Sequence, residues 1–212
     1  MELIYKYIAK QFGNPTGFWG KISTFAMNRL NKEQYKTIFK NIDIQKTDTI
    51  LDIGFGNGYL LRRLAKENPQ KIYGIDISQD MLKAATRKSH KEIEQEKIQL
   101  LSADVQKMPF EDSLIDKAYT VNTVYFWQDI HQGFAEIRRI LKSNGIFLNV
   151  LYLDEWLDKL PITRYGFSKY TAKQIEKITA ESGLKIECII EIQPKKSICI
   201  VARNQKTATN KI

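Results

Sequence analysis

The chain has 212 residues, of which 43% are hydrophobic, and a formal net charge of +9. This length suits one domain with a short extension, and no apolar run approaches the ~20 residues that a membrane-spanning helix needs. The first residues mix charges and tyrosines where a secretory signal would be continuously apolar, and two cysteines are too few for a disulfide framework, so we expect a cytoplasmic protein. Cys188 and Cys199 lie in apolar runs and are expected to be buried.

Residues 1–48 are predicted to form an N-terminal helical extension. It is interrupted by residues 12–20, a stretch with three glycines, one proline and three aromatic residues, Trp19 among them. Such a stretch fits either a loop whose rings pack on the following domain or a lid that closes over a ligand. The sequence leaves both interpretations open.

Residues 49–204 are predicted to form the main domain, because strand-like and helix-like segments alternate along them. Asn68-Pro69 ends the first helix, Ser78 caps the second, Asn144-Gly145 marks a turn and Gly183 ends the last helix. The tail 205–212 is polar and is expected to be disordered. The predicted strands are 50–53, 72–77, 98–101, 117–121, 146–151, 184–192 and 197–202, and the predicted helices begin near 60, 78, 130 and 171.

The segment Asp52-Ile-Gly-Phe-Gly-Asn-Gly58 connects the first predicted strand to the first predicted helix. Three glycines on alternate positions allow a turn too tight for residues with a Cβ atom, and they predict backbone N–H groups that face a ligand. The spacing departs from the G-x-G-x-x-G pattern of dinucleotide folds, and a carboxylate beside the turn would repel a pyrophosphate. A positively charged ligand suits Asp52 better.

This segment resembles the first motif of class I S-adenosylmethionine-dependent methyltransferases, within the broad methyltransferase-11-like group that is similar to ubiquinone and menaquinone pathway methyltransferases. The resemblance covers residues 48–151 well and the last two strands by pattern only. It implies a doubly wound, Rossmann-like α/β fold with a mostly parallel seven-stranded sheet in the order 3-2-1-4-5-7-6, the last strand antiparallel. It also implies S-adenosyl-L-methionine as cofactor. Phe55 departs from the family, which often has a small residue there.

Four successive predicted strands each deliver a polar residue at or just beyond their carboxyl end, namely Asp52, Asp76, Asp104 and Asn122. Because ligands of open parallel sheets bind beyond the carboxyl ends of the strands, these residues are candidate ligand contacts. An aspartate after a strand is also a common helix cap, so one such residue alone would mean little.

The resemblance assigns each of these residues a role toward the cofactor. It implies that Asp76 accepts from the ribose hydroxyls, that Asp104 accepts from the adenine amino group, and that Asn122 lies near the methionyl amine. The complete set of predicted cofactor contacts is Asp52, Gly54, Gly56, Gly58, Asp76, Ile77, Met81, Asp104, Val105 and Asn122.

Aromatic residues after the fourth strand and elsewhere are the candidates for contact with a methyl acceptor. The predicted acceptor residues are Trp19, Tyr125, Trp127 and Tyr165. No residue is assigned as catalytic, because in-line displacement on an activated methyl group is driven mainly by positioning. His131 lies on a polar helix face and is expected to be solvated, and no metal site is predicted.

The predicted function is transfer of a methyl group to an unidentified small molecule, and the oligomeric state is left open. Two alternatives keep the cofactor: an RNA or protein acceptor, and a binding protein without catalysis. The basic residues are spread over both flanks of the chain rather than gathered in a run, which disfavours nucleic acid without excluding it. A nicotinamide-dependent oxidoreductase is disfavoured by the glycine spacing.

Overall fold

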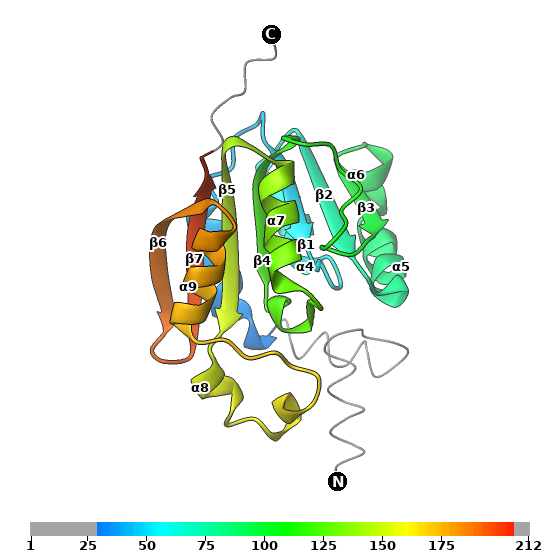
Figure 1. Cartoon of the computed structure of the whole chain (residues 1–212). Coiled ribbons are helices and arrows are strands. Elements are labelled where there is room, and N and C mark those ends of the chain that lie inside the picture. Colours follow the sequence, from blue (N-terminus) through cyan, green and yellow to red (C-terminus); the bar gives the residue numbers. More distant parts are fainter. Residues whose placement is uncertain (1–28, 206–212) are drawn as a thin grey trace.

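The structure of the protein is a computed structural model that describes residues 29–205. The first 28 residues of the predicted extension, with Trp19, and residues 206–212 of the predicted tail lie outside the described range. Figure 1 shows the described part as one sheet with helices on both faces. The strands are β1 (Thr49–Ile53), β2 (Lys71–Asp76), β3 (Ile98–Ser102), β4 (Ile115–Val121), β5 (Leu141–Tyr152), β6 (Leu184–Gln193) and β7 (Ser197–Asn204). The helices are α3 (Lys32–Asn41), α4 (Tyr59–Leu64), α5 (Gln79–Lys88), α6 (His90–Glu94), α7 (Ile130–Ile140), α8 (Asp154–Leu157) and α9 (Ala172–Glu181).

The seven strands follow the order β3-β2-β1-β4-β5-β7-β6, which confirms the predicted sheet. Strands β1 to β5 pair in parallel, and β7 lies antiparallel to both of its neighbours. Parallel strands need crossover connections. Helices α4, α5 with α6, and α7 lie in three of them, whereas residues 103–114 join β3 to β4 without a helix. The carboxyl ends of the parallel strands therefore meet at one edge, the lower edge in Figure 1.

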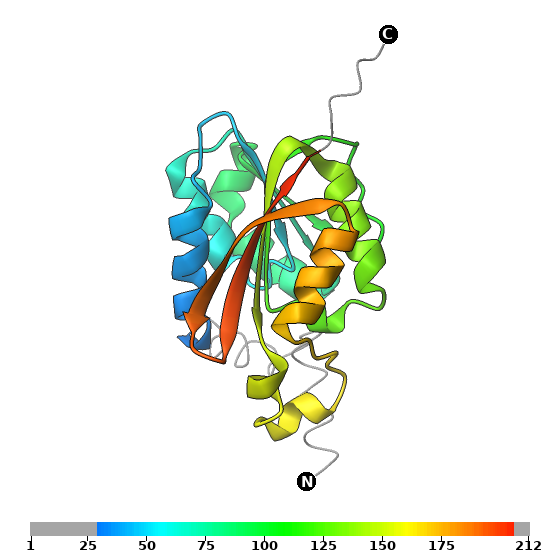
Figure 2. The ribbon, with the colours of Figure 1, turned by 60° about the vertical axis from the view of Figure 1, so that its left-hand side comes forward.

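Two apolar layers cover the sheet, as Figure 2 shows with the sheet seen nearly edge-on. One layer packs α3, α4 and α5 on the sheet through buried residues such as Ile38, Leu61 and Ala85. The other packs α7 and α9 through residues such as Phe134, Ile137 and Ile175. Strand β1 has all five residues buried, because it lies at the centre of the sheet under both layers.

Local signals in the sequence place most element boundaries where they were predicted. Ser78 accepts a hydrogen bond from Met81 N at the start of α5, and Gly183, with φ +82°, follows α9. Helix α4 gives way to a 3₁₀ turn (Ala65–Glu67) that ends at Asn68, where φ is +58°. Within residues 29–205 no helix is both long enough and apolar enough to cross a membrane.

Two sequence-based expectations about the strands are wrong in detail. The fifth strand begins at Leu141 rather than after a turn at Asn144 and Gly145, and that turn survives as a register shift within β5, with Asn144 at φ +64°. Cys188 is exposed rather than buried. Strand β6 is the outer strand of the sheet, and a register shift between Ile186 and Cys188 interrupts its inward and outward alternation.

Candidate active site

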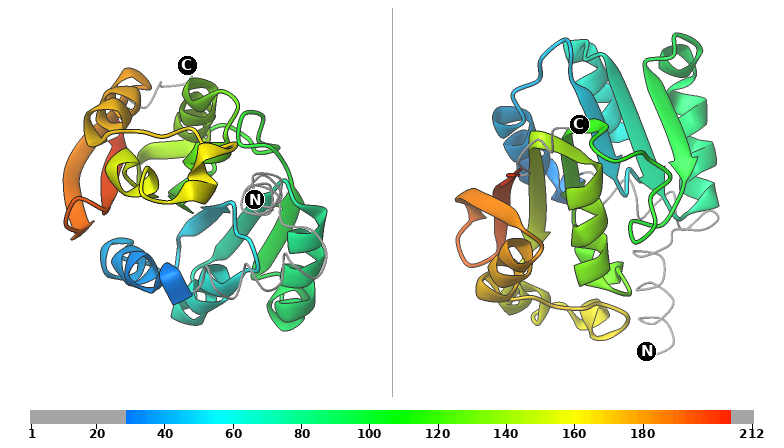
Figure 3. Two further views of the ribbon diagram at one scale, coloured as in Figure 1. Left: turned by 90° about the horizontal axis from the view of Figure 1, so that it is seen from below. Right: turned by 45° about the horizontal axis from the view of Figure 1, so that its top comes forward.

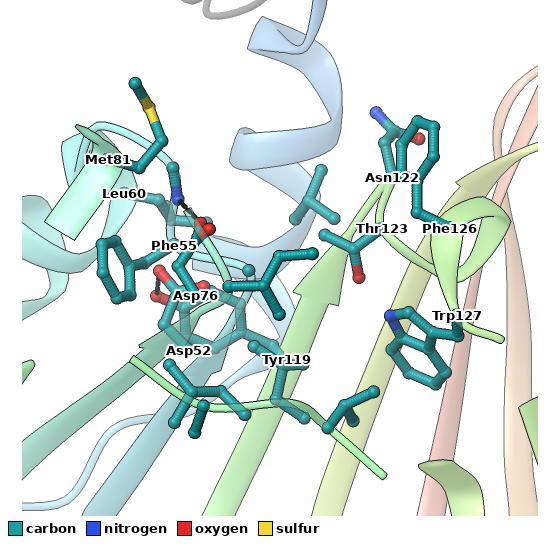
Figure 4. A pocket seen from close by; sticks show the side chains of 18 of the residues that line it. Asp52, Phe55, Leu60, Asp76, Met81, Tyr119, Asn122, Thr123, Phe126 and Trp127 are labelled. Carbon is teal, nitrogen blue, oxygen red and sulfur yellow. Dashed lines mark hydrogen bonds between the residues drawn. The ribbon is translucent and has the colours of Figure 1, made fainter. Parts of the chain in front are cut away.

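A pocket opens at the carboxyl ends of β1, β2 and β4, with a cavity volume of about 180 Å³. Figure 3 views this edge of the sheet directly in its left panel. Figure 4 shows two walls, one carrying Asp52, Asp76 and Met81 and the other carrying Thr123, Phe126 and Trp127. A concave site at this edge is where open α/β sheets bind their ligands.

The glycine turn between β1 and α4 forms the floor of the pocket. Gly54, Gly56 and Gly58 have φ values of +77°, +54° and +69°, a region that favours glycine. A Cβ at Gly54 would lie 2.4 Å from Thr123 Cγ2, whereas one at Gly56 would meet nothing within 4 Å. A side chain at position 54 would therefore clash with Thr123. At position 56 there is room for a side chain, and glycine is favoured there only by the backbone conformation.

The expectation that the amides of this turn face a ligand is wrong for most of them. Gly54 N and Phe55 N donate to the Ile75 carbonyl at 2.8 and 3.4 Å, and Gly56 N donates to Asp76 Oδ2 at 2.8 Å. Gly58 N donates to the Phe55 carbonyl at 2.9 Å, and Tyr59 N to Asn57 Oδ1 at 3.0 Å. The amides bind the turn to β2 and to itself, because buried N–H groups are satisfied within the protein wherever possible.

Asp76 closes the turn from the end of β2. Its Oδ2 accepts from Gly56 N, and its Oδ1 accepts from Ser78 N, each at 2.8 Å. Burial raises the pKa of this carboxyl, and the two backbone hydrogen bonds oppose the rise. A carboxylate oxygen has more than one acceptor site, so Asp76 can hold the turn and still accept from a ligand hydroxyl.

Asp52 lies at the bottom of the pocket with only 4% of its surface exposed. Its Oδ2 accepts from the Tyr119 hydroxyl at 2.7 Å. Burial raises the pKa of Asp52 to about 7, the charge of Asp76 adds to the rise, and the hydrogen bond from Tyr119 opposes it. The pocket thus has a carboxyl group whose ionised form would be stabilised by a cation bound nearby.

Most predicted cofactor contacts meet at this pocket. The lining includes Asp52, Gly54, Gly56, Asp76, Ile77, Met81, Asp104, Val105 and Asn122. Gly58 is outside the lining, and a Cβ there would lie 3.1 Å from Ala85 Cβ, so this glycine lets α4 approach α5. The Asp104 carboxylate accepts from Gln106 N at 2.9 Å in a local turn.

Only one of the predicted acceptor residues in the described range lines the pocket. Trp127 lines the pocket, but Tyr125 and Tyr165 do not. Tyr125 is the middle residue of the 3₁₀ turn Val124–Phe126, and its side chain, which is 3% exposed, packs into the core. Phe126, which the turn presents to the pocket instead, packs edge-to-face against Phe167 with the ring centroids 4.7 Å apart.

Sequence reasoning missed several residues of this site. Tyr119 lies within the predicted fourth strand and Thr123 follows it, and their place beside Asp52 and Gly54 follows only from the pairing of β1 with β4. Asn31 and Tyr35 come from the first turn of α3 and its approach, and they line the pocket from a part of the chain that carries no motif. Within the described ranges no group of three His, Cys, Asp or Glu side chains is placed to hold a metal ion.

Comparisons with known proteins agree with this geometry. Residues 51–149 match a family described as "Methyltransferase domain". The chain is 27% identical to a protein described as "Uncharacterized methyltransferase YdaC" of Bacillus subtilis (strain 168), over 88% of this chain and 99% of that protein. Other curated relatives match about half of this chain and less than half of their own length.

Solved structures show the same fold at low identity. One is a complex between the Haloferax volcanii activator Trm112 and a methyltransferase, with a TM-score of 0.75, 20% identity and coverage of 85% of this chain and 93% of that one. Another is geranyl diphosphate C-methyltransferase of Streptomyces coelicolor with S-adenosyl-L-homocysteine, with a TM-score of 0.73, 13% identity and coverage of 83% and 78%. The sheet order, the glycine turn and the match to a methyltransferase domain over residues 51–149 together support a class I S-adenosylmethionine-dependent methyltransferase.

Proposed function

We propose that the chain binds S-adenosyl-L-methionine in this pocket and transfers its methyl group to a small organic molecule. The observation that carries the proposal is the meeting of Asp52, Asp76 and the glycine turn at one cavity. When bound, the cofactor supplies a methyl group on a positively charged sulfur, which needs no further activation. The protein's task is then to hold two partners in line.

The residues present fit such a cofactor in shape and charge. Asp76 presents a carboxylate to sugar hydroxyls at the end of β2, and the neighbouring Ile77, which is 51% exposed, offers an apolar surface to a base. Met81 lines the same side of the pocket. Asp52, deeper in the site, favours a ligand that carries positive charge.

The opposite wall suits an organic acceptor. Phe126 and Trp127 present apolar surface from the turn after β4, and Thr123 and Asn122 add neutral polar groups. Aromatic faces also tolerate a neighbouring cation. An acceptor held between these rings and the cofactor would be positioned without a dedicated base, which is the mechanism we propose.

Isothermal titration calorimetry with S-adenosyl-L-methionine and S-adenosyl-L-homocysteine tests the proposal. We expect both to bind the wild type and Asp76→Ala to bind them about 10- to 100-fold more weakly, as expected for lost charge-assisted hydrogen bonds. Asp158→Ala is the matched control, since this carboxylate pairs with Lys169 on the surface. A wild type that binds neither compound, or an Asp76→Ala variant that binds as tightly as wild type, would overturn the proposal.

A further inference from the structure

A buried polar cluster joins α3 to the end of β4 beside the pocket. Gln34 Nε2 donates to Asn122 Oδ1 at 3.3 Å, and Asn122 Nδ2 donates back to Gln34 Oε1 at 2.8 Å. The two carboxamides thus form a reciprocal pair across 88 positions of the sequence. Gln34 is 1% exposed and does not line the pocket, whereas Asn122 does.

The pair is part of a longer network that includes a second residue of the pocket lining. Asn122 Nδ2 also donates to Asn31 Oδ1 at 3.1 Å, and Asn31 lines the pocket. The Tyr125 hydroxyl lies 3.1 Å from Asn122 Oδ1 and 3.1 Å from the Tyr152 carbonyl, and its one proton can be donated to either. Each of the four polar atoms of the paired carboxamides therefore makes at least one hydrogen bond within the protein.

The backbone at Asn122 needs this support. Asn122 has φ +59°, a conformation that costs energy for a residue with a side chain, although asparagine tolerates it better than most. Its N–H donates to the Val150 carbonyl at 2.8 Å, and its side chain is held from α3. Two anchors on different elements thus fix one residue of the pocket wall.

We propose that Gln34 is a positioning residue that sets the cofactor affinity of the pocket by holding Asn122, which in turn donates to Asn31. This inference rests on the proposed function. Gln34 does not touch the ligand. Its effect comes from the match between its donor and acceptor and those of Asn122, because an unmatched polar group at this depth costs the binding conformation its stability.

The variant Gln34→Glu tests this match, because a carboxyl group has the shape of a carboxamide and a donor that depends on pH. At pH 8 the ionised side chain has no donor for Asn122 Oδ1, and we expect affinity for S-adenosyl-L-homocysteine to fall about tenfold. Burial at this depth raises the pKa of a glutamic acid well above its ordinary value of about 4.3, so we expect the carboxyl to be protonated at pH 5.5 and to donate and accept as glutamine does. Affinity should then return to within about threefold of the wild type measured at the same pH, since both interactions are restored.

The ratio of variant to wild type at each pH isolates this effect. The titratable groups that face the network are Tyr35, Tyr125 and Tyr152, and burial raises the pKa of each, so all three stay neutral from pH 5.5 to 8. Asp52, beyond Tyr35, titrates in both proteins and cancels in the ratio.

Two further variants complete the experiment. Gln34→Leu cannot donate or accept at any pH and should bind weakly at both. Thr37→Val is the matched control, since Thr37 is a buried polar residue of the same helix whose hydroxyl donates to the Glu33 carbonyl. It should bind like the wild type.

The outcomes separate cleanly. A Gln34→Glu variant that binds like the wild type at pH 8, or one that stays as weak as Gln34→Leu at pH 5.5, would overturn the inference. Both measurements use one folded sample, so a general loss of structure cannot imitate recovery on acidification. If the wild type binds no S-adenosyl-L-homocysteine, the proposed function fails instead.

Discussion

The variant Asp52→Asn should change how the stability of the ligand-free protein depends on pH. In the wild type, burial raises the pKa of the Asp52 carboxyl from 3.8 to about 7. The folded protein therefore holds a proton on this group that the unfolded chain has released over the same pH range. Stability must fall as the pH rises through this interval, because the unfolded state binds fewer protons.

The size of the effect follows from the two pKa values. At ~1.4 kcal/mol per pKa unit, the free energy of unfolding of the wild type loses about 4 kcal/mol between pH 4 and pH 8 through this group. About 2 to 3 kcal/mol of this loss falls between pH 5 and pH 8. The amide of Asp52→Asn does not titrate, and it still accepts the hydrogen bond from the Tyr119 hydroxyl.

Urea unfolding at pH 5, 6, 7 and 8 measures this difference. We expect Asp52→Asn to gain on the wild type by about 2 to 3 kcal/mol from pH 5 to pH 8, whatever constant offset its new N–H group adds. Asp129→Asn is the matched control, because Asp129 caps α7 and asparagine caps a helix as well as aspartate. A difference between Asp52→Asn and wild type that stays flat over this range would refute the reasoning.

Four further substitutions test the packing around the site. Gly54→Ala should cost more than about 2 kcal/mol of stability, since its Cβ would meet Thr123 at 2.4 Å. Gly56→Ala should cost only about 1 kcal/mol, because its Cβ meets nothing and the backbone conformation alone is unfavourable. Urea midpoints of the two variants measure this difference, and equal costs would contradict it. Phe167→Ala should lower stability by about 2 kcal/mol through the aromatic contacts it removes, and thermal unfolding that leaves the midpoint unchanged would count against it. Arg139→Ala should cost about 1 to 3 kcal/mol and speed proteolysis within residues 105–113, because its guanidinium donates to the carbonyls of that loop; unaltered cleavage would speak against this role.

The alternation of apolar runs with amphipathic segments was enough to predict the fold. Strand β1 is largely apolar because it is buried on both faces. Ser78 begins α5 and Gly183 follows the end of α9 through local chemistry that needs no tertiary contact. The order of the strands came from the resemblance carried by the glycine motif, since no local pattern specifies which strands are neighbours. Cys188 shows the limit of pattern reasoning, because a register shift in an outer strand leaves no mark in composition.

The candidate site was predictable where its residues follow strands and not where they depend on pairing between distant segments. Asp52 and Asp76 could be found because each lies at the carboxyl end of a strand, at the same edge of a parallel sheet. The pairing of Gln34 with Asn122 could not, since α3 reaches β4 only after the sheet has formed. The destination of the amides in the glycine turn is likewise a tertiary property, set by the position of Ile75 beside Gly54.

The internal bonding of the glycine turn has a thermodynamic consequence for any molecule that enters the cavity. A segment already closed by Asp76 and the Ile75 carbonyl has lost its conformational entropy during folding, once, instead of at each encounter with a ligand. Association then need not wait for the segment to order, and little of the contact energy is consumed by reorganisation. A turn that is already rigid would let the protein release one ligand and bind the next without any rearrangement of the glycine turn.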